Sequence, residues 1–271
     1  MVKKWIGRLY ALGVFIFLYA PIAVLIAYSF NSGKSRGRWE GFTFEWYRTL
    51  FHNQQISSAL YYTLIIAILS ATIATVIGVA AAIGLSRMKP RFQKAAMNVN
   101  YLPVLNPDIV TGIALMLFFV SAGVRLGFGT MLLAHIIFNI PYVILSVAPR
   151  LRKSSSRLME AAMDLGATPM QALWKVVLPE IFPGIMSGFL IAFTLSIDDF
   201  VISFFTTGSG VSNLSIEIYS MARRGVKPEI NALSTLLFLT VLLLLIGINL
   251  LSKRGGKKKN GDELAEQSLM V

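Results

Sequence analysis

Apolar runs long enough to cross a lipid bilayer recur along this chain. A bilayer core about 30 Å thick requires roughly 20 apolar residues in a helix. Six stretches meet this requirement, at about 9–30, 60–86, 97–121, 128–149, 183–207 and 230–252. Prolines interrupt the third stretch and acidic residues interrupt the fifth. The pattern therefore predicts an all-α integral membrane protein with six transmembrane helices.

Composition supports this prediction and removes several other classes. Of the 271 residues, 55% are hydrophobic and only 14% are charged, whereas a soluble domain carries about 25% charged residues. The same figures exclude intrinsic disorder and a coiled coil. The absence of cysteine excludes disulfides and thiolate metal sites. His52 and His135 are too few and too far apart for a histidine-rich metal site, so we expect no metal.

The net charge of +12 is explained by topology. With the N-terminus in the cytoplasm, 17 of the 25 lysines and arginines fall in the predicted inner segments. This bias follows the positive-inside rule, and it predicts that both termini are cytoplasmic. The basic excess then requires no nucleic-acid partner. The first span is too long for the apolar region of a signal peptide, so we expect it to be retained.

Three regions are expected along the chain. Residues 1–59 form the first span and an extracytoplasmic interfacial segment, and residues 60–252 form a five-helix core. Residues 253–271 form a basic cytoplasmic tail that we expect to be disordered. In the first region, aromatic residues around Trp46 favour an amphipathic helix at the membrane interface. Alternatively, the Trp46 ring could face an amine, through a cation–π contact.

Small residues repeat every four positions in the second span, at Ala67, Ala71 and Thr75. This spacing allows two helix backbones to approach closely. We expect these residues to pack inside the helix bundle rather than to contact cargo.

The predicted cytoplasmic loop 150–182 is the most informative segment. Serines 154–156 offer helix N-caps, and Gly166 is placed to end the short helix that would follow them. Thr168 and Pro169 suit the start of a second short helix, which Leu178-Pro179 is expected to end. Two short helices with a fixed turn between them would form a docking surface.

The same loop resembles a family motif. Glu160-Ala161-Ala162, then Gly166 after three residues, then Leu178-Pro179 is similar to the EAA loop of ABC-importer permeases, the inner membrane components of binding-protein-dependent transport systems. Val176 stands where the family favours isoleucine. The resemblance implies a type I, MetI-like transmembrane domain in the bacterial inner membrane. It also implies that Glu160, Ala161, Ala162, Gly166, Leu178 and Pro179 couple the chain to an ATPase.

Further stretches resemble the polyamine branch of that family. They are PIAVLIAYSFN, NPDIVTGIAL, FTLSIDDFVISFFTTG and IYSMARRGVKPEINALSTL. The resemblance implies import of spermidine, putrescine or both. The implied partners are a second homologous permease, two ATP-binding subunits and an extracytoplasmic polyamine-binding protein. ATP and Mg²⁺ would bind in the ATPase subunits, and we expect this chain to hold no cofactor and to have no enzymatic activity of its own.

Three acids, Asp108, Asp198 and Asp199, fall within predicted spans. A charged side chain at the bilayer centre costs about 2.5–3.5 kcal/mol on insertion scales, so such residues mark pathways or polar contacts. We expect a weak cation relay of Asp108, Asp198, Asp199 and Ser196. The alternatives are a helix N-cap role for Asn106 or Asp108, and a polar contact between subunits for the acidic pair.

Two other functions fit part of the pattern. A stand-alone cation channel or secondary carrier would also use intramembrane acids, but the six spans show no clear inverted repeat. An importer of the same architecture could carry another cationic or small organic solute. The chain has no GxxxxGK[ST] stretch to bind nucleotide, so an importer would need a partner for energy.

Overall fold

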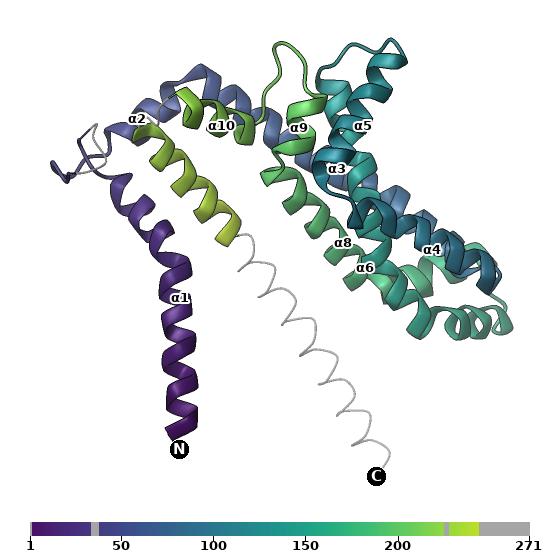
Figure 1. The fold of residues 1–271 in the computed structure, drawn as a ribbon. Helices are drawn as coiled ribbons and strands as arrows, with labels where there is room; N and C mark the ends of the chain where they lie inside the picture. Colours follow the sequence, from purple (N-terminus) through teal and green to yellow (C-terminus); the bar gives the residue numbers. More distant parts are fainter. Residues whose placement is uncertain (1, 34–37, 225–227, 244–271) are drawn as a thin grey trace. The chain divides into compact units, whose positions relative to one another are not determined.

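The chain is helical wherever its regular structure is described, apart from one bridge between Asn31 and Phe42. The computed structural model describes residues 2–33, 38–224 and 228–243, with side chains except at 2–4, 153–157 and 224. The helices are α1 (Val2–Tyr28), α2 (Glu45–His52), α3 (Gln54–Ser86), α4 (Pro90–Leu105), α5 (Asp108–Ser121), α6 (Phe128–Asp164), α7 (Pro169–Ala172), the π-helix η1 (Leu173–Val177), α8 (Leu178–Asp198), α9 (Val201–Thr206) and α10 (Leu214–Arg224) (Figure 1).

Four of these helical stretches are long and apolar enough to cross a membrane, and α4 with α5 forms a fifth if the bent pair counts as one span. The two helices meet at an angle of 101°. A shorter apolar helix, Pro228–Leu243, covers the start of the expected sixth span. The rest of that span and the expected tail at 253–271 lie outside the described residues.

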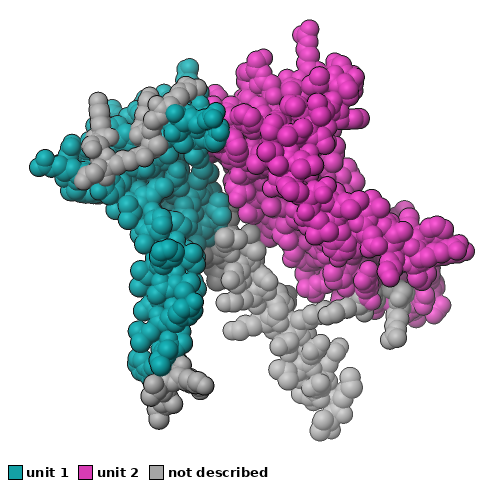
Figure 2. All heavy atoms as spheres, in the orientation of Figure 1, with its two compact units in different colours: residues 1–57, 218–271 teal, residues 58–217 magenta. Residues whose placement is uncertain are grey.

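The chain divides into two compact units, residues 1–57 with 218–271, and residues 58–217 (Figure 2). In the first unit, α2 buries Trp46 and Leu50 on one face and exposes Arg48 and Thr49 on the other. The sequence therefore predicted an amphipathic helix here correctly. The Trp46 indole Nε1 donates a 2.6 Å hydrogen bond to the carbonyl of Asn31, which ties α2 to the end of α1.

The second unit is built on close contact between helices. Ala67 and Ala71 of α3 are fully buried, which confirms the packing role predicted for the small residues of this span. A Cβ at Gly78 would lie 2.7 Å from Val143 Cγ1 of α6. A Cβ at Gly188 of α8 would lie 3.2 Å from the Val143 Cα. The absence of a side chain at Gly78 and Gly188 therefore allows α3 and α8 to pack closely on α6.

The prediction that serines 154–156 begin a new helix is wrong. The helix α6 runs without a break to Asp164. It ends as predicted at Gly166, whose φ of +88° is left-handed. The Gly166 N–H donates to the Met163 carbonyl and the Ala167 N–H donates to the Ala162 carbonyl. These two bonds are those of a Schellman motif, which fixes the direction of the chain as it leaves the helix.

The second predicted helix begins as expected but does not end at Leu178-Pro179. Thr168 caps it, accepting from the Gln171 N–H while the Gln171 side chain accepts from the Thr168 N–H. A single apolar helical stretch then continues from Pro169 to Asp198. Pro179 has no N–H, and its ring would clash with the carbonyl four residues earlier. The wider turn of η1, where the Leu178 N–H reaches back to the Leu173 carbonyl, accommodates the proline without a stop.

Candidate functional site at two adjacent helix breaks

Two of the apolar helical stretches are broken. Between α4 and α5, Asn106 and Pro107 are extended, with ψ of 143° and 135°. Proline restricts the residue before it to extended conformations, so the break follows from Pro107. The expected N-cap role of Asn106 or Asp108 is wrong, because Pro107 holds the cap position and Asp108 is the first residue of α5. The partial positive charge at the start of that helix stabilises the negative charge of Asp108.

The second break separates α8 from α9 at Asp199 and Phe200. The two breaks are close in space because α5 packs against α9 (Figure 1). At this contact a Cβ on Gly112 would lie 3.4 Å from the Val201 carbonyl oxygen and 3.5 Å from the Ile202 Cα. Gly112 is one turn after Asp108, and Val201 directly follows the second break. The absence of a side chain at Gly112 thus brings the two breaks together.

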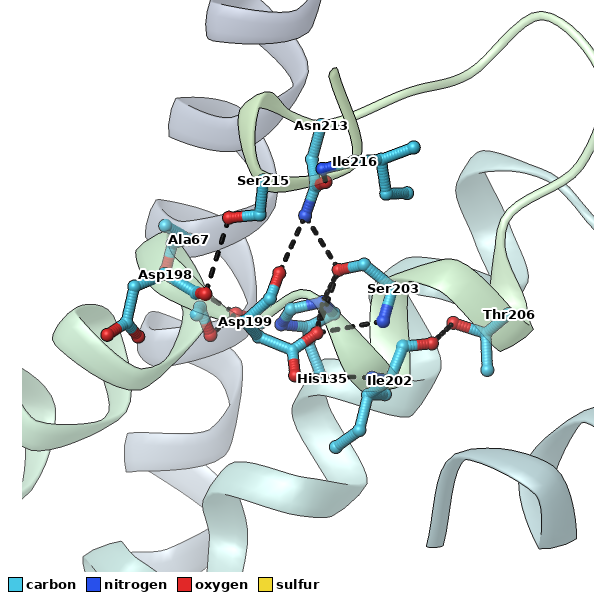
Figure 3. Close-up of polar contacts among 12 residues, drawn as sticks. Ala67, His135, Asp198, Asp199, Ile202, Ser203, Thr206, Asn213, Ser215 and Ile216 are labelled. Atoms are coloured by element: carbon cyan, nitrogen blue, oxygen red, sulfur yellow. Dashed lines mark hydrogen bonds and ion pairs between the residues drawn. The ribbon is translucent and has the colours of Figure 1, made fainter. Parts of the chain in front are cut away.

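The Asp199 carboxylate is turned into the protein and held by the start of α9. Its Oδ1 accepts from the Ile202 N–H at 3.2 Å, and its Oδ2 accepts from the Ser203 N–H at 2.8 Å and from the Ser203 hydroxyl at 2.9 Å (Figure 3). His135 Nε2 of α6 lies 3.6 Å from Oδ2. With 7% of its side chain exposed, Asp199 contributes a buried negative charge.

Asn213, which precedes α10, completes this group. Its Nδ2 donates 2.7 Å to the Ser203 hydroxyl and 3.0 Å to the Asp199 carbonyl. Asp199, His135, Ser203 and Asn213 are called here the Asp199 network. Its three neutral members were not predicted from the sequence, because a lone histidine, serine or asparagine in an apolar run carries no local signal.

The Asp198 carboxylate points away from the network (Figure 3) and is exposed. Asp108, the first residue of α5, is also exposed. Within the described part of the chain, no lysine or arginine forms an ion pair with any of the three carboxylates. The α5–α9 contact therefore brings the helix breaks that carry the three predicted acids together, with the Asp108 and Asp198 carboxylates accessible and the Asp199 carboxylate enclosed.

Ser196 does not face this open region. It is 1% exposed, its hydroxyl accepts from Asn139 Nδ2 at 2.8 Å, and it lies 3.0 Å from the Ser70 hydroxyl. These three residues join α8, α6 and α3 through buried hydrogen bonds. In this conformation Ser196 connects the end of α8, just before the second break, to α6 and α3.

The remaining predicted site residues lie elsewhere. Trp46 is in the other compact unit and is 8% exposed. The predicted coupling residues are on the surface around the Gly166 turn, where Glu160, Ala161 and Pro179 are exposed and Ala162 and Leu178 are half-buried. Apolar side chains are exposed beside them, at Leu165, Met170 and Trp174.

Other candidate sites are chemically less suited to a cation. A cleft of about 720 Å³ between α4 and α6 is lined by basic residues, Lys94 and Arg152, and by no acid. Among residues 2–33, 38–224 and 228–243, no group of three or more histidine, aspartate or glutamate side chains could hold a metal ion.

Comparison with known proteins places the chain in a family. Residues 74–255 match the family described as binding-protein-dependent transport system inner membrane component. The chain belongs to this family. It is therefore a membrane component of such a transport system, and it is located in the inner membrane.

Two relatives in this family are similar over most of their length. The spermidine/putrescine transport system permease protein PotC of Escherichia coli strain K12 is 39% identical over 261 residues, 95% of this chain and 99% of that protein. The putrescine transport system permease protein PotI of the same strain is 41% identical over 230 residues, 82% of each chain.

Solved structures of ABC transporters share the fold. A bacterial ABC transporter that imports the acidic polysaccharide alginate has a chain that matches with a TM-score of 0.73, at 18% identity, over 93% of this chain and 96% of that chain. The methionine ABC transporter MetNI matches with a TM-score of 0.59, at 22% identity, over 73% of this chain and 96% of that chain. At these identities the likeness concerns the fold alone, and that fold is the ABC-importer transmembrane domain.

Proposed function

We propose that this chain is the permease subunit of an ATP-driven importer that carries polyamines, spermidine or putrescine, across the bacterial inner membrane. The observation that carries the proposal is the identity of 39% and 41% to two polyamine permeases over most of the chain. The acids at the two helix breaks support it independently. Exposed carboxylates without a fixed cationic partner are suited to a positively charged solute.

The site that we propose for cargo is the region of the two breaks. Discontinuous helices at membrane depth are tolerated where the free backbone is buried or lines a cavity, and transporters use them to build binding sites. Asp108 and Asp198 would contact the ammonium groups, while Asp199 and Ser196 would act from inside the helix bundle. A role for Trp46 in the pathway would require its buried ring to become accessible.

Coupling to ATP would occur at loop 150–182. The proposal assigns Glu160, Ala161, Ala162, Gly166, Leu178 and Pro179 to contact with an ATPase subunit. The exposed apolar side chains of Leu165, Met170 and Trp174 support a docking surface there, because they are costly to leave in water. The rigid Schellman turn would transmit movement of the ATPase into α6 and α8.

The proposed complex contains this chain, a second permease subunit, two ATP-binding subunits and an extracytoplasmic binding protein. ATP and Mg²⁺ would bind in the ATPase subunits, where hydrolysis would take place. The proposed topology has six spans and two cytoplasmic termini. Residues 1–59 would lead into the five-helix core at 60–252, followed by the tail at 253–271.

Uptake competition tests the proposal. Cells that carry the complete set of transporter genes would be given labelled spermidine with an excess of unlabelled putrescine, arginine, choline or methionine. We expect putrescine to compete with labelled spermidine and the other three solutes to have no effect. Competition by choline or arginine with none by putrescine would assign the transporter to another cation. A stand-alone carrier would be indicated by uptake that persists when the ATPase gene is deleted.

A further inference from the structure

The Asp199 network separates the roles of two adjacent acids. We propose that His135, Ser203 and Asn213 are positioning residues that hold Asp199 as a fixed internal charge, and that this arrangement presents the neighbouring Asp198 carboxylate to the cargo. The inference rests on the proposed function for the identity of the cargo. It adds a division of labour between Asp198 and Asp199 and assigns a role to three neutral residues.

The hydrogen atoms around Ser203 can be assigned from the contacts. A serine hydroxyl donates one hydrogen bond and accepts up to two. Ser203 lies 2.9 Å from the Asp199 Oδ2, which can only accept, so its hydrogen is directed there. The Asn213 Nδ2 donates to the Ser203 hydroxyl. The remaining contact, 2.9 Å to His135 Nε2, must then be a bond that the imidazole donates.

This assignment fixes the form of His135. The hydrogen on Nε2 leaves Nδ1 as an acceptor in the neutral ring, and Nδ1 has no partner among the described residues. A charged imidazole would carry a second N–H there, buried and unpaired, which is costly. His135 is 1% exposed, so bulk solvent does not reach the ring. The neutral ring therefore orients Ser203 without cancelling the negative charge of Asp199.

Both the side-chain carboxylate and the backbone carbonyl of Asp199 are held by hydrogen bonds, and these bonds fix the break between α8 and α9. Its carboxylate is bound by the first turn of α9, and its carbonyl accepts from Asn213. The carbonyl of Asp198 accepts a 3.3 Å hydrogen bond from the Ser215 hydroxyl. Among the described residues, the Asp198 carboxylate receives no hydrogen bond from another side chain. The restraint thus acts on the backbone and leaves the Asp198 carboxylate accessible.

Because the chain contains no cysteine, a single introduced cysteine can report on this positioning. In the assembled transporter, an Asp198→Cys variant would be treated with a cationic methanethiosulfonate. Mass spectrometry would follow the modified fraction of this chain over time, which gives the rate of modification per molecule. The rate would be compared in the Ser203→Ala, His135→Leu and His135→Gln backgrounds. Glutamine can still donate to Ser203, whereas leucine cannot. Ser187→Ala in α8, an exposed serine bonded only to its own helix, is the matched control.

We expect Ser203→Ala and His135→Leu to change the rate by about fivefold to thirtyfold, the effect of losing one or two hydrogen bonds of about 1 kcal/mol each. His135→Gln and Ser187→Ala should leave it within about twofold. A reduced amount of folded protein cannot produce this pattern, because the rate is measured per molecule. Equal rates in all four backgrounds would overturn the positioning role.

Protection by cargo separates this inference from the proposed function. Spermidine or putrescine, supplied with the binding protein and ATP, should slow modification at position 198 in the otherwise unchanged chain. If the rates depend on Ser203 and His135 but no polyamine protects, the positioning role stands and the polyamine assignment at Asp198 is wrong. Polyamine could also protect position 198 equally in every background, with the same unprotected rate of modification in each. That result would support the cargo site and exclude a positioning role for the Asp199 network.

Discussion

His135 Nε2 and Asp199 Oδ2 are 3.6 Å apart, and the Ser203 hydroxyl lies within 2.9 Å of both. The contact is therefore bridged by a neutral donor and is not a simple ion pair. It joins α6 to the start of α9 at the point where the fifth apolar stretch is broken. The Asp199 carboxylate at this junction is enclosed, whereas the carboxylate of its neighbour Asp198 is exposed.

The turn at Gly166 should be required for coupling. Changing Gly166 to valine forces a β-branched residue into a left-handed conformation at φ +88°, at a cost of about 1–3 kcal/mol, although no atom lies within 4 Å of the new Cβ. The chain would relieve this strain by reshaping the turn. We expect ATP hydrolysis to continue while the polyamine transported per ATP falls by about tenfold, the equivalent of about 1.4 kcal/mol.

A second left-handed glycine provides the control for that experiment. Gly123, with φ +71°, follows α5 and is equally open. Its change to valine introduces the same backbone strain at a different place. We expect Gly123→Val to lower thermal stability but to keep the ratio of transport to hydrolysis. Equal loss of coupling in both variants would argue against a specific role for loop 150–182.

Close packing of α3 on α6 should limit what position 78 can hold. A methyl group at Gly78 would lie 2.7 Å from Val143 Cγ1, so Gly78→Ala should destabilise the chain by about 1–3 kcal/mol. The second change Val143→Ala would make room and restore part of that loss. Gly84→Ala in the same helix, with nothing within 4 Å, should have little effect. Melting of the purified transporter in detergent would compare the variants, and additive losses at 78 and 143 would contradict the contact.

Because Trp46 is buried, we expect its substitution to lower the stability of the chain rather than to change transport directly. Trp46→Phe keeps the aromatic ring but removes the donor to the Asn31 carbonyl, and an unpaired buried carbonyl costs about 1–3 kcal/mol. We expect a lower melting temperature with an unchanged KM for polyamine uptake in the transporters that assemble. A raised KM with unchanged melting would instead support the predicted contact between Trp46 and cargo.

Sequence reasoning predicted those features that depend on local patterns. The break at Pro107, the left-handed turn at Gly166 and the cap at Thr168 follow from the geometry of single residues and are present. The burial of Ala67 and Ala71 followed from four-residue spacing. Asp108, Asp198 and Asp199 stand out in the sequence because a charge in an apolar run is costly.

Features that depend on distant contacts could not be predicted in this way. The continuation of the helix past Leu178-Pro179 requires a wider π turn, which local proline rules do not anticipate. The enclosure of Asp199 depends on His135 and Asn213, which are 64 residues before it and 14 residues after it in the sequence. Neighbouring residues on a helix differ by about 100° in direction, which allowed different roles for the two acids but did not assign them.

The KM for spermidine uptake by an Asp198→Asn variant tests the central claim most directly. A hydrogen bond to a charged group contributes about 1.5–3 kcal/mol, and about 1.4 kcal/mol corresponds to a tenfold change in affinity. With Asp198→Glu and Asp199→Asn measured alongside, we predict that Asp198→Asn raises KM by about tenfold to 100-fold. Asp198→Glu should restore most of the affinity, and Asp199→Asn should act mainly on Vmax. A KM for Asp198→Asn equal to that of the unaltered transporter would contradict the account.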